Sequence, residues 1–139
     1  MAIESMNHFN VLTDDVEATR RFYVGILGLK EGPRPPFSFG GIWLYAGGKP
    51  ILHISEQELP RERSGVIDHI AFTSKDLRTT LSTLDRNAIP YSVSKQMQTG
   101  IWQVFFRDPM GAKVELDFDP AEDAPAGVKL SGAGPRAAL

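Results

Sequence analysis

Four side chains in this sequence have the chemistry of metal ligands. They are the only three histidines, His8, His53 and His69, and one glutamate, Glu115. Neutral imidazole and carboxylate groups favour borderline divalent ions such as Fe²⁺, Mn²⁺, Ni²⁺, Co²⁺ or Zn²⁺. Two histidines and one carboxylate on one side of an ion leave open positions for a substrate or water. These residue types therefore predict a divalent metal centre suited to Lewis-acid or oxygen chemistry.

The four candidates fall at matching points of an internal repeat. His8 and His69 each open an apolar segment that leads into a helix-like segment, and His53 and Glu115 lie in the last strand candidate of each half. Two copies of one unit, each with two potential ligands, suggest a metal centre on a pseudo-twofold axis. The matching segments are 7–12 with 68–73, 41–43 with 100–102, and 51–55 with 113–117.

Each half of the chain predicts one β-α-β-β-β module, about 6–55 and about 66–118. Alternating apolar residues indicate strands, and apolar residues three and four apart indicate helices. Asp14 and Glu17 resemble a capping box at the start of the first helix, and Gly28 is suited to its end. The predicted strands are 6–12, 42–46, 50–55, 66–73, 91–95, 101–107 and 112–118, and the predicted helices are 16–27 and 76–87.

Strand alternation predicts where the candidate ligands point. Leu116 and its alternate neighbours form an apolar face in the last strand, so Glu115 points away from the packed layer. The same reasoning applies to the three histidines, which would all project from the face opposite the helices. If the two sheets curve towards each other, the four residues converge in one cleft. Further residues predicted to face that cleft are Asn10, Ile42, Leu44, Thr73, Gln103, Phe105 and Arg107.

Two segments have no regular pattern. Residues 32–41 are rich in proline and glycine and predict a loop, in which Phe37 and Phe39 either cover a ligand or anchor the loop to the core. Residues 121–139 are rich in proline, alanine, glycine and charged residues without periodicity. We expect that tail to be mobile or held by docking on a neighbour.

Composition limits the class of protein. A chain of 139 residues is most simply one compact domain, here placed at 1–120 before the tail. Its 17 acidic and 15 basic residues form no basic stripe, which argues against nucleic acid as a partner. The absence of cysteine excludes thiolate sites, and neither a secretory signal nor a membrane-length apolar stretch is visible. We therefore expect a cytoplasmic protein that acts on a small molecule.

Four motifs lie at residues 7–8, 18–29, 68–72 and 107–116. Together they resemble those of the vicinal oxygen chelate superfamily, which includes glyoxalase I, extradiol dioxygenases and bleomycin-resistance proteins. The resemblance spans residues 6–118 and implies an α+β fold of paired βαβββ modules, a curved mixed sheet with a central metal cleft. It implies His8, His69 and Glu115 as metal ligands, a substrate that chelates the ion through two neighbouring oxygens, and a homodimer.

His53 departs from the pattern of glyoxalase I. That enzyme has a glutamate or glutamine at this position, and its opposing glutamates also move the substrate proton, so Glu115 and His53 are the catalytic candidates. His53 could be a fourth ligand, or an acid or base if its pKa lies near neutrality. Extradiol dioxygenases have a tyrosine where this chain has Phe105, and a further histidine near residues 96–98, where this chain has none.

Three functional hypotheses remain. The first is a metal-dependent lyase or isomerase of glyoxalase-like type that works through a chelated oxyanion. The second is an Fe(II)-dependent dioxygenase with His53 as an acid or base beside the metal. The third is a binding protein that sequesters a small aromatic or antibiotic-like ligand. Metal analysis and oxygen consumption distinguish them.

Overall fold

The computed structural model describes residues 4–63, 65 and 67–131. The chain divides into two compact units, Met1–Arg61 and Glu62–Leu139. We call these the first unit and the second unit, and each corresponds to one predicted module. No helix in the described part of the chain has the length and apolarity needed to cross a membrane.

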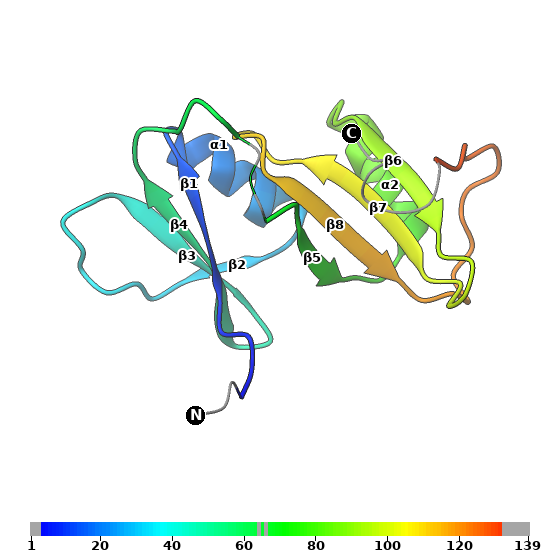
Figure 1. Cartoon of the computed structure of the whole chain (residues 1–139), viewed down its shortest axis with the longest axis horizontal. Coiled ribbons are helices and arrows are strands. Elements are labelled where there is room, and N and C mark those ends of the chain that lie inside the picture. Colours follow the sequence, from blue (N-terminus) through cyan, green and yellow to red (C-terminus); the bar gives the residue numbers. More distant parts are fainter. Residues whose placement is uncertain (1–3, 64, 66, 132–139) are drawn as a thin grey trace. The chain divides into compact units, whose positions relative to one another are not determined.

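The first unit contains one four-stranded mixed sheet (Figure 1). Its strand order is β1-β4-β3-β2, with β1 parallel to β4 and the other neighbours antiparallel. The short strand β2 was not predicted, because its three residues Lys-Glu-Gly have no apolar alternation. The elements are β1 (Phe9–Thr13), α1 (Val16–Arg20), η1 (Arg21–Ile26), β2 (Lys30–Gly32), β3 (Gly41–Ala46) and β4 (Lys49–Glu56).

The second unit repeats this arrangement with the strand order β5-β8-β7-β6. Again the first and last strands of the unit are parallel neighbours, and α2 lies across one face of the sheet (Figure 1). Both units therefore have the predicted β-α-β-β-β order, and the α+β architecture is confirmed. The elements are β5 (Ile70–Thr73), α2 (Leu77–Arg86), β6 (Tyr91–Lys95), β7 (Trp102–Arg107) and β8 (Lys113–Phe118).

The first helix differs from its prediction at both ends. Its N-cap is Asp15, whose side chain accepts a hydrogen bond from the Ala18 amide, so the cap lies one residue after the predicted Asp14. From Arg21 the helix widens into the π-helix η1, and the Leu27 amide donates to the carbonyl of Phe22. The wider turn accompanies the burial of two consecutive aromatic side chains, Phe22 and Tyr23.

The second helix is capped by the tail. The amide of Leu77 donates to the carboxylate of Glu122 at 2.6 Å, while the Nε1 of Trp102 donates to the Glu122 backbone carbonyl at 2.8 Å. Further on, Leu130 forms a β-bridge with Val93. The described part of the predicted tail therefore contacts its own unit, and residues 132–139 lie outside the described residues.

Strand register corrects two expectations for the first unit. Ile42 pairs with Ile54, and Leu44 pairs with Leu52, so Ile42 and Leu44 lie on the apolar core face and not beside His53. Trp43 is the residue opposite His53. The second copy of the Gly-Ile-Trp sequence has a different register, because Trp102 pairs with Phe118. The sequence repeat at 41–43 and 100–102 is therefore not a structural equivalence.

Candidate metal centre

His8 and His53 lie together in the first unit. His8 immediately precedes β1, and His53 lies in β4 opposite Asn10. Because side chains two residues apart share one face of a strand, His8 projects on the same side as His53. Their ring centroids are 3.9 Å apart, with the planes inclined by 19°.

Trp43 completes this stack of rings. Its centroid is 3.9 Å from that of His53, with an interplanar angle of only 3°, so the His53 ring lies between Trp43 and His8. The Nε2 atom of His53 is buried and has no hydrogen-bond partner among the residues that the structure describes. Burial lowers the pKa of His53 below its ordinary value, and the neighbouring His8 lowers it further. The arrangement therefore keeps His53 neutral, with a free nitrogen available to an ion or a proton.

His69 and Glu115 are the corresponding pair in the second unit. His69 immediately precedes β5, and Glu115 lies in β8 opposite Ala71. The Nε2 of His69 lies 2.7 Å from Oε2 of Glu115, whose side chain is 5 % exposed. The ring of Phe105 meets His69 edge-on, with centroids 5.9 Å apart. One imidazole nitrogen and one carboxylate oxygen, both potential metal ligands, therefore lie side by side in the second unit.

His8 and His69, the histidines that immediately precede the first strand of each unit, are the opening histidines. In both, Nδ1 contacts the side chain of the preceding residue. Nδ1 of His8 lies 2.7 Å from Oδ1 of Asn7, and Nδ1 of His69 lies 2.9 Å from Oδ2 of Asp68. Asp68 in turn accepts a hydrogen bond from Lys113 at 3.2 Å. A proton on Nδ1 held by an outer carboxylate or amide is the arrangement found in histidine metal ligands. The 2.7 Å contact of the His69 Nε2 with Glu115 is a hydrogen bond that a metal ion would replace.

Glu115 lies in a dehydrated, acidic environment. Burial raises the pKa of Glu115 above its ordinary value, and the adjacent carboxyl group of Asp117 raises it further, while His69 and Gln103 act in the opposite direction. The side-chain amide of Gln103 donates a hydrogen bond to Glu115. A divalent cation would remove the cost of burying this negative charge, so the carboxylate suits an ion.

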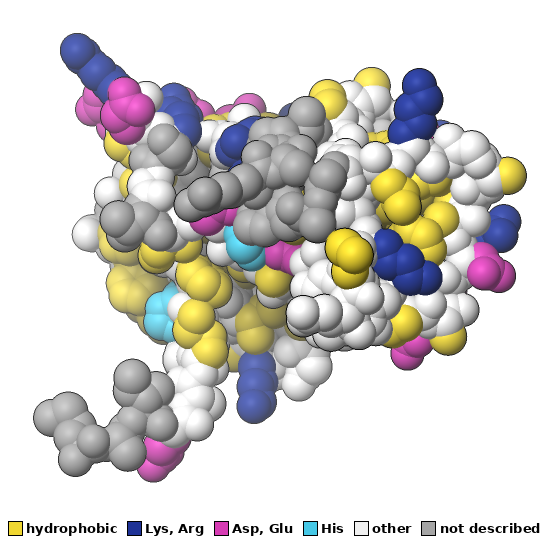
Figure 2. Space-filling model, turned by 45° about the vertical axis from the view of Figure 1, so that its right-hand side comes forward, with side chains coloured by type: hydrophobic (Ala, Val, Ile, Leu, Met, Phe, Trp, Pro, Cys, Tyr) yellow, Lys and Arg dark blue, Asp and Glu magenta, His cyan; other side chains and the backbone are white. Residues whose placement is uncertain are grey.

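The predicted site residues therefore occur as two pairs, one in each unit. Within the described part of the chain, His, Asp and Glu side chains form no group of three or more that could hold an ion. His8 is exposed and the side chain of His69 is 25 % exposed, and histidine side chains reach the surface in Figure 2.

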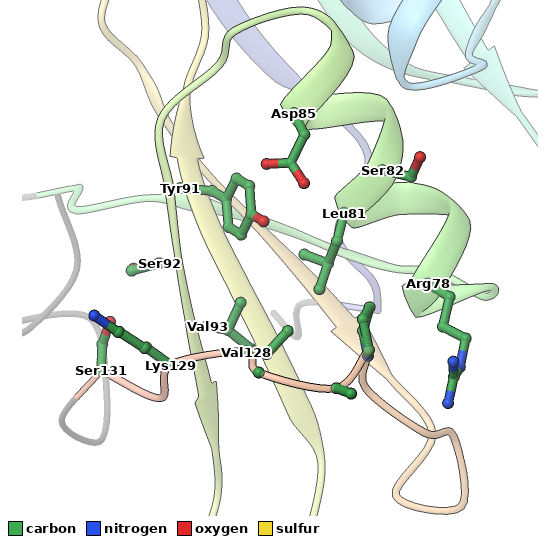
Figure 3. A pocket seen from close by; sticks show the side chains of 13 residues that line it. Arg78, Leu81, Ser82, Asp85, Tyr91, Ser92, Val93, Val128, Lys129 and Ser131 are labelled. Atoms are coloured by element: carbon green, nitrogen blue, oxygen red, sulfur yellow. The ribbon is translucent and has the colours of Figure 1, made fainter.

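A hollow of about 610 Å³ lies elsewhere in the second unit, between α2, β6 and the tail. Figure 3 shows Leu81 and Tyr91 on its wall, with Arg78 at one end. None of the four predicted ligands lines it. The hollow is therefore separate from the predicted site.

Sequence reasoning missed the contributions of Trp43 and Asp117. Strand 41–46 reads Gly-Ile-Trp-Leu-Tyr-Ala, and its apolar residues do not distinguish its two faces. Asp117, in contrast, is two residues after Glu115 in the same strand, and strand alternation alone places it beside that carboxylate. Of the other residues predicted to face the site, Gln103 contacts Glu115 and Phe105 contacts His69, whereas Arg107 donates to the carbonyl of Gly111 at 2.8 Å.

Comparisons with known proteins agree with the fold. The family model of the Glyoxalase/Bleomycin resistance protein/Dioxygenase superfamily matches residues 5–116. Glyoxylase I 4 of Arabidopsis thaliana is 30% identical over 122 residues, which cover 82% of this chain and 70% of that protein.

Two solved structures illustrate the similarity. A Bacillus anthracis protein assigned to the glyoxalase family has a TM-score of 0.70 at 22% identity, covering 86% of this chain and 98% of its own. Lactoylglutathione lyase from Agrobacterium tumefaciens has a TM-score of 0.63 at 20% identity, covering 86% and 97%. The chain belongs to the Glyoxalase/Bleomycin resistance protein/Dioxygenase superfamily.

Proposed function

We propose that the protein is a metal-dependent, glyoxalase-like lyase or isomerase. Its substrate is a small molecule that chelates the ion through neighbouring oxygens. His8, His69 and Glu115 would be the ligands, and His53 would be a fourth ligand or the group that moves a proton. The observation that carries this proposal is the pairing in the second unit, where Nε2 of His69 lies 2.7 Å from the Glu115 carboxylate.

The donor set fits a borderline divalent ion. Imidazole nitrogens and a carboxylate suit Fe²⁺, Mn²⁺, Ni²⁺, Co²⁺ or Zn²⁺. Two features of these residues support the fit: the Nε2 of His53 is buried without a partner, and the Nδ1 atoms of the two opening histidines are already occupied. When bound, the ion would polarise substrate oxygens and stabilise the negative charge that develops on them.

His53 would transfer the substrate proton between two carbon atoms. A lowered pKa keeps its ring neutral near pH 7, so Nε2 could accept a proton from a carbon beside a carbonyl group and return it to the neighbouring carbon. Stacking against Trp43 restricts the ring to one plane. The same stack limits access of water to the ring, which favours return of the proton to the substrate rather than its loss to solvent.

Metal analysis of the freshly purified full-length protein tests the proposal. We expect about one divalent ion per chain, with retention lost in Glu115→Ala. A matched control is Glu62→Ala, which removes an exposed carboxylate of the same unit. If Glu115→Ala keeps the ion at full occupancy, the proposed ligand set is wrong.

The same preparation separates the other hypotheses. Iron together with oxygen consumption on catechols would indicate a dioxygenase and contradict the lyase or isomerase assignment. Ligand binding that is unaffected by a chelator, in a protein without stoichiometric metal, would indicate a sequestering protein. Isomerisation of a 2-oxoaldehyde adduct that stops with chelator and resumes with added ion would support the proposal.

We further propose that the protein is a homodimer. Among the exposed large apolar residues are Met6, 70 % exposed, and Ile67, 68 % exposed, which occupy equivalent positions before the two opening histidines. An interface that covers both side chains would remove their apolar surface from water. Light scattering should give twice the chain mass of 15.3 kDa, and Met6→Lys with Ile67→Lys should reduce it to one chain mass.

A further inference from the structure

A row of polar side chains crosses the sheet of the second unit next to Glu115. Strand pairing joins Ser94 to Gln103, Gln103 to Asp117, and Asp117 to Thr73, so one residue comes from each of the four strands. The neighbouring row contains Glu115. Because residues two apart in a strand share a face, the polar row lies on the same side of the sheet as Glu115.

Within the described part of the chain, three oxygens on this face are buried without hydrogen-bond partners. They are Oγ of Ser92, Oγ of Ser94 and Oδ1 of Asp117. Ser94 is only 2 % exposed. Figure 3 shows the Ser92 side chain directed away from α2, on the opposite side of β6 from Tyr91. Buried polar atoms are nearly always satisfied in native proteins, so a ligand or water that donates hydrogen bonds to these oxygens would be stabilised on this face.

On the equivalent face of the first unit, the buried polar atom without a hydrogen-bond partner among the described residues is a nitrogen, Nε2 of His53, and not an oxygen. Ser55 lies two residues after His53, as Asp117 lies two residues after Glu115. Its hydroxyl already accepts a hydrogen bond from Nδ2 of Asn10 at 3.0 Å, and its strand partners are Leu12 and Gly41. The unsatisfied oxygens are therefore a property of the second unit rather than of the repeated fold.

We propose that Ser92, Ser94 and Asp117 form a subsite that accepts hydroxyl or amino hydrogens of the substrate. The inference rests on the proposed function, since the chelating oxygens of the same substrate would bind the ion at Glu115. A carboxylate accepts hydrogen bonds and donates none, so this subsite selects ligands that carry donors and disfavours ligands with only a methyl group there. The substrate class is a small chelating molecule with a further hydroxyl or amine next to the chelating pair.

Three probes that share one chelating unit test the inference. Lactate, glycerate and isoserine are all 2-hydroxy carboxylates. The third carbon carries no hydrogen-bond donor in lactate, a hydroxyl in glycerate and an amine in isoserine. The full-length protein is loaded with Co²⁺, and binding is followed by the visible spectrum of the ion. We expect glycerate and isoserine to bind about tenfold more tightly than lactate.

Single substitutions locate the effect. Asp117→Ala, beside Glu115, should remove most of the preference, whereas Ser94→Ala, two strands away, should reduce it by a smaller factor. A cooperative thermal unfolding transition shows that each variant is folded. Ser82→Ala, on the exposed side of α2, is the matched control and should keep the preference. Equal affinities of the three probes for the unsubstituted protein would overturn the subsite.

Two other outcomes distinguish failure of the proposed function from failure of the subsite. If none of the probes changes the Co²⁺ spectrum, or no Co²⁺ binds, the proposed function itself fails. If Asp117→Ala alters only the free energy of unfolding and keeps the preference, the oxygens are satisfied by internal water, and the subsite is wrong.

Discussion

The two units use one backbone arrangement to prepare two different pairs of side chains. In the first unit, His53 is a neutral ring stacked between Trp43 and His8. In the second, Glu115 is a buried carboxylate beside a second acidic group, with His69 at its oxygen. The two units therefore place a pair of potential ligands at the same position, but the first pair is two histidines and the second includes a carboxylate. The difference indicates that the first unit is suited to moving a proton and the second to binding a cation.

The largest expected effect is a loss of unfolding free energy when the aromatic ring that contacts each pair is removed. Phe105 is 1 % exposed and contacts His69, while Trp43 is partly exposed and stacks on His53. Phe105→Ala should lower the free energy of unfolding by about 3–5 kcal/mol. Trp43→Ala should cost less, about 2 kcal/mol, because its ring keeps more contact with water. Urea unfolding measures both, and equal costs would contradict the comparison.

The second prediction concerns metal-dependent stability. Free Co²⁺ at about 100 times its dissociation constant should raise the free energy of unfolding by about 2.7 kcal/mol. His69→Ala should abolish this increment, whereas His53→Gln should retain at least half of it, since the second unit supplies the anionic ligand. The readout is thermal unfolding with and without a chelator. A larger loss in His53→Gln than in His69→Ala would reverse the roles assigned to the two units.

The third prediction concerns the side chains that contact Nδ1 of His8 and His69, and it uses substitutions that make the two contacts more alike. Asp68→Asn gives the second unit the amide that Asn7 provides in the first. A weaker partner at Nδ1 reduces ligand basicity, so metal affinity should fall about tenfold. Asn7→Asp should raise it by a smaller factor. Competition with a chromophoric chelator measures both, and unchanged affinity in Asp68→Asn would show that this contact does not support the ligand.

The smallest effect is the pH dependence of the first unit. The pKa of His53 is lowered below its ordinary 6.5, so the folded protein binds fewer protons than the unfolded chain just below that pH. The stability contributed by neutral His53 is therefore present above 6.5 and is lost as the pH falls through the folded pKa. NMR titration should show one histidine titrating below 6.5, and His53→Gln should remove that resonance and flatten the acid side of the stability profile.

The sequence predicted the elements better than the contacts between them. Among the described residues, periodicity identified both helical segments and seven of the eight strands, because their apolar faces are buried. It missed Lys30–Gly32, whose pairing with β3 depends on the neighbouring strand rather than on its own residues. In β3 every residue between the terminal Gly41 and Ala46 is apolar or aromatic, so its two faces could not be distinguished and Trp43 was overlooked.

The candidate site was predictable to the level of pairs. Repeat position and strand alternation place His8 with His53 and His69 with Glu115, and each unit has that pairing. The rotation of each ring was not predictable, because it depends on hydrogen bonds such as that of Asn7 and on stacking against Trp43. These are tertiary contacts without a periodic signal in the sequence.

Glu122 connects the dynamics of two segments that are far apart in sequence. Its carboxylate binds the first amide of α2, and its backbone carbonyl accepts from Trp102. Detachment of the tail would therefore release the start of α2 and the indole of β7 in the same opening event, so that exchange of their protons with solvent would report one common opening free energy. An aperiodic segment after the last strand thus belongs to the cooperative folding unit of the helix that precedes it by some 40 residues.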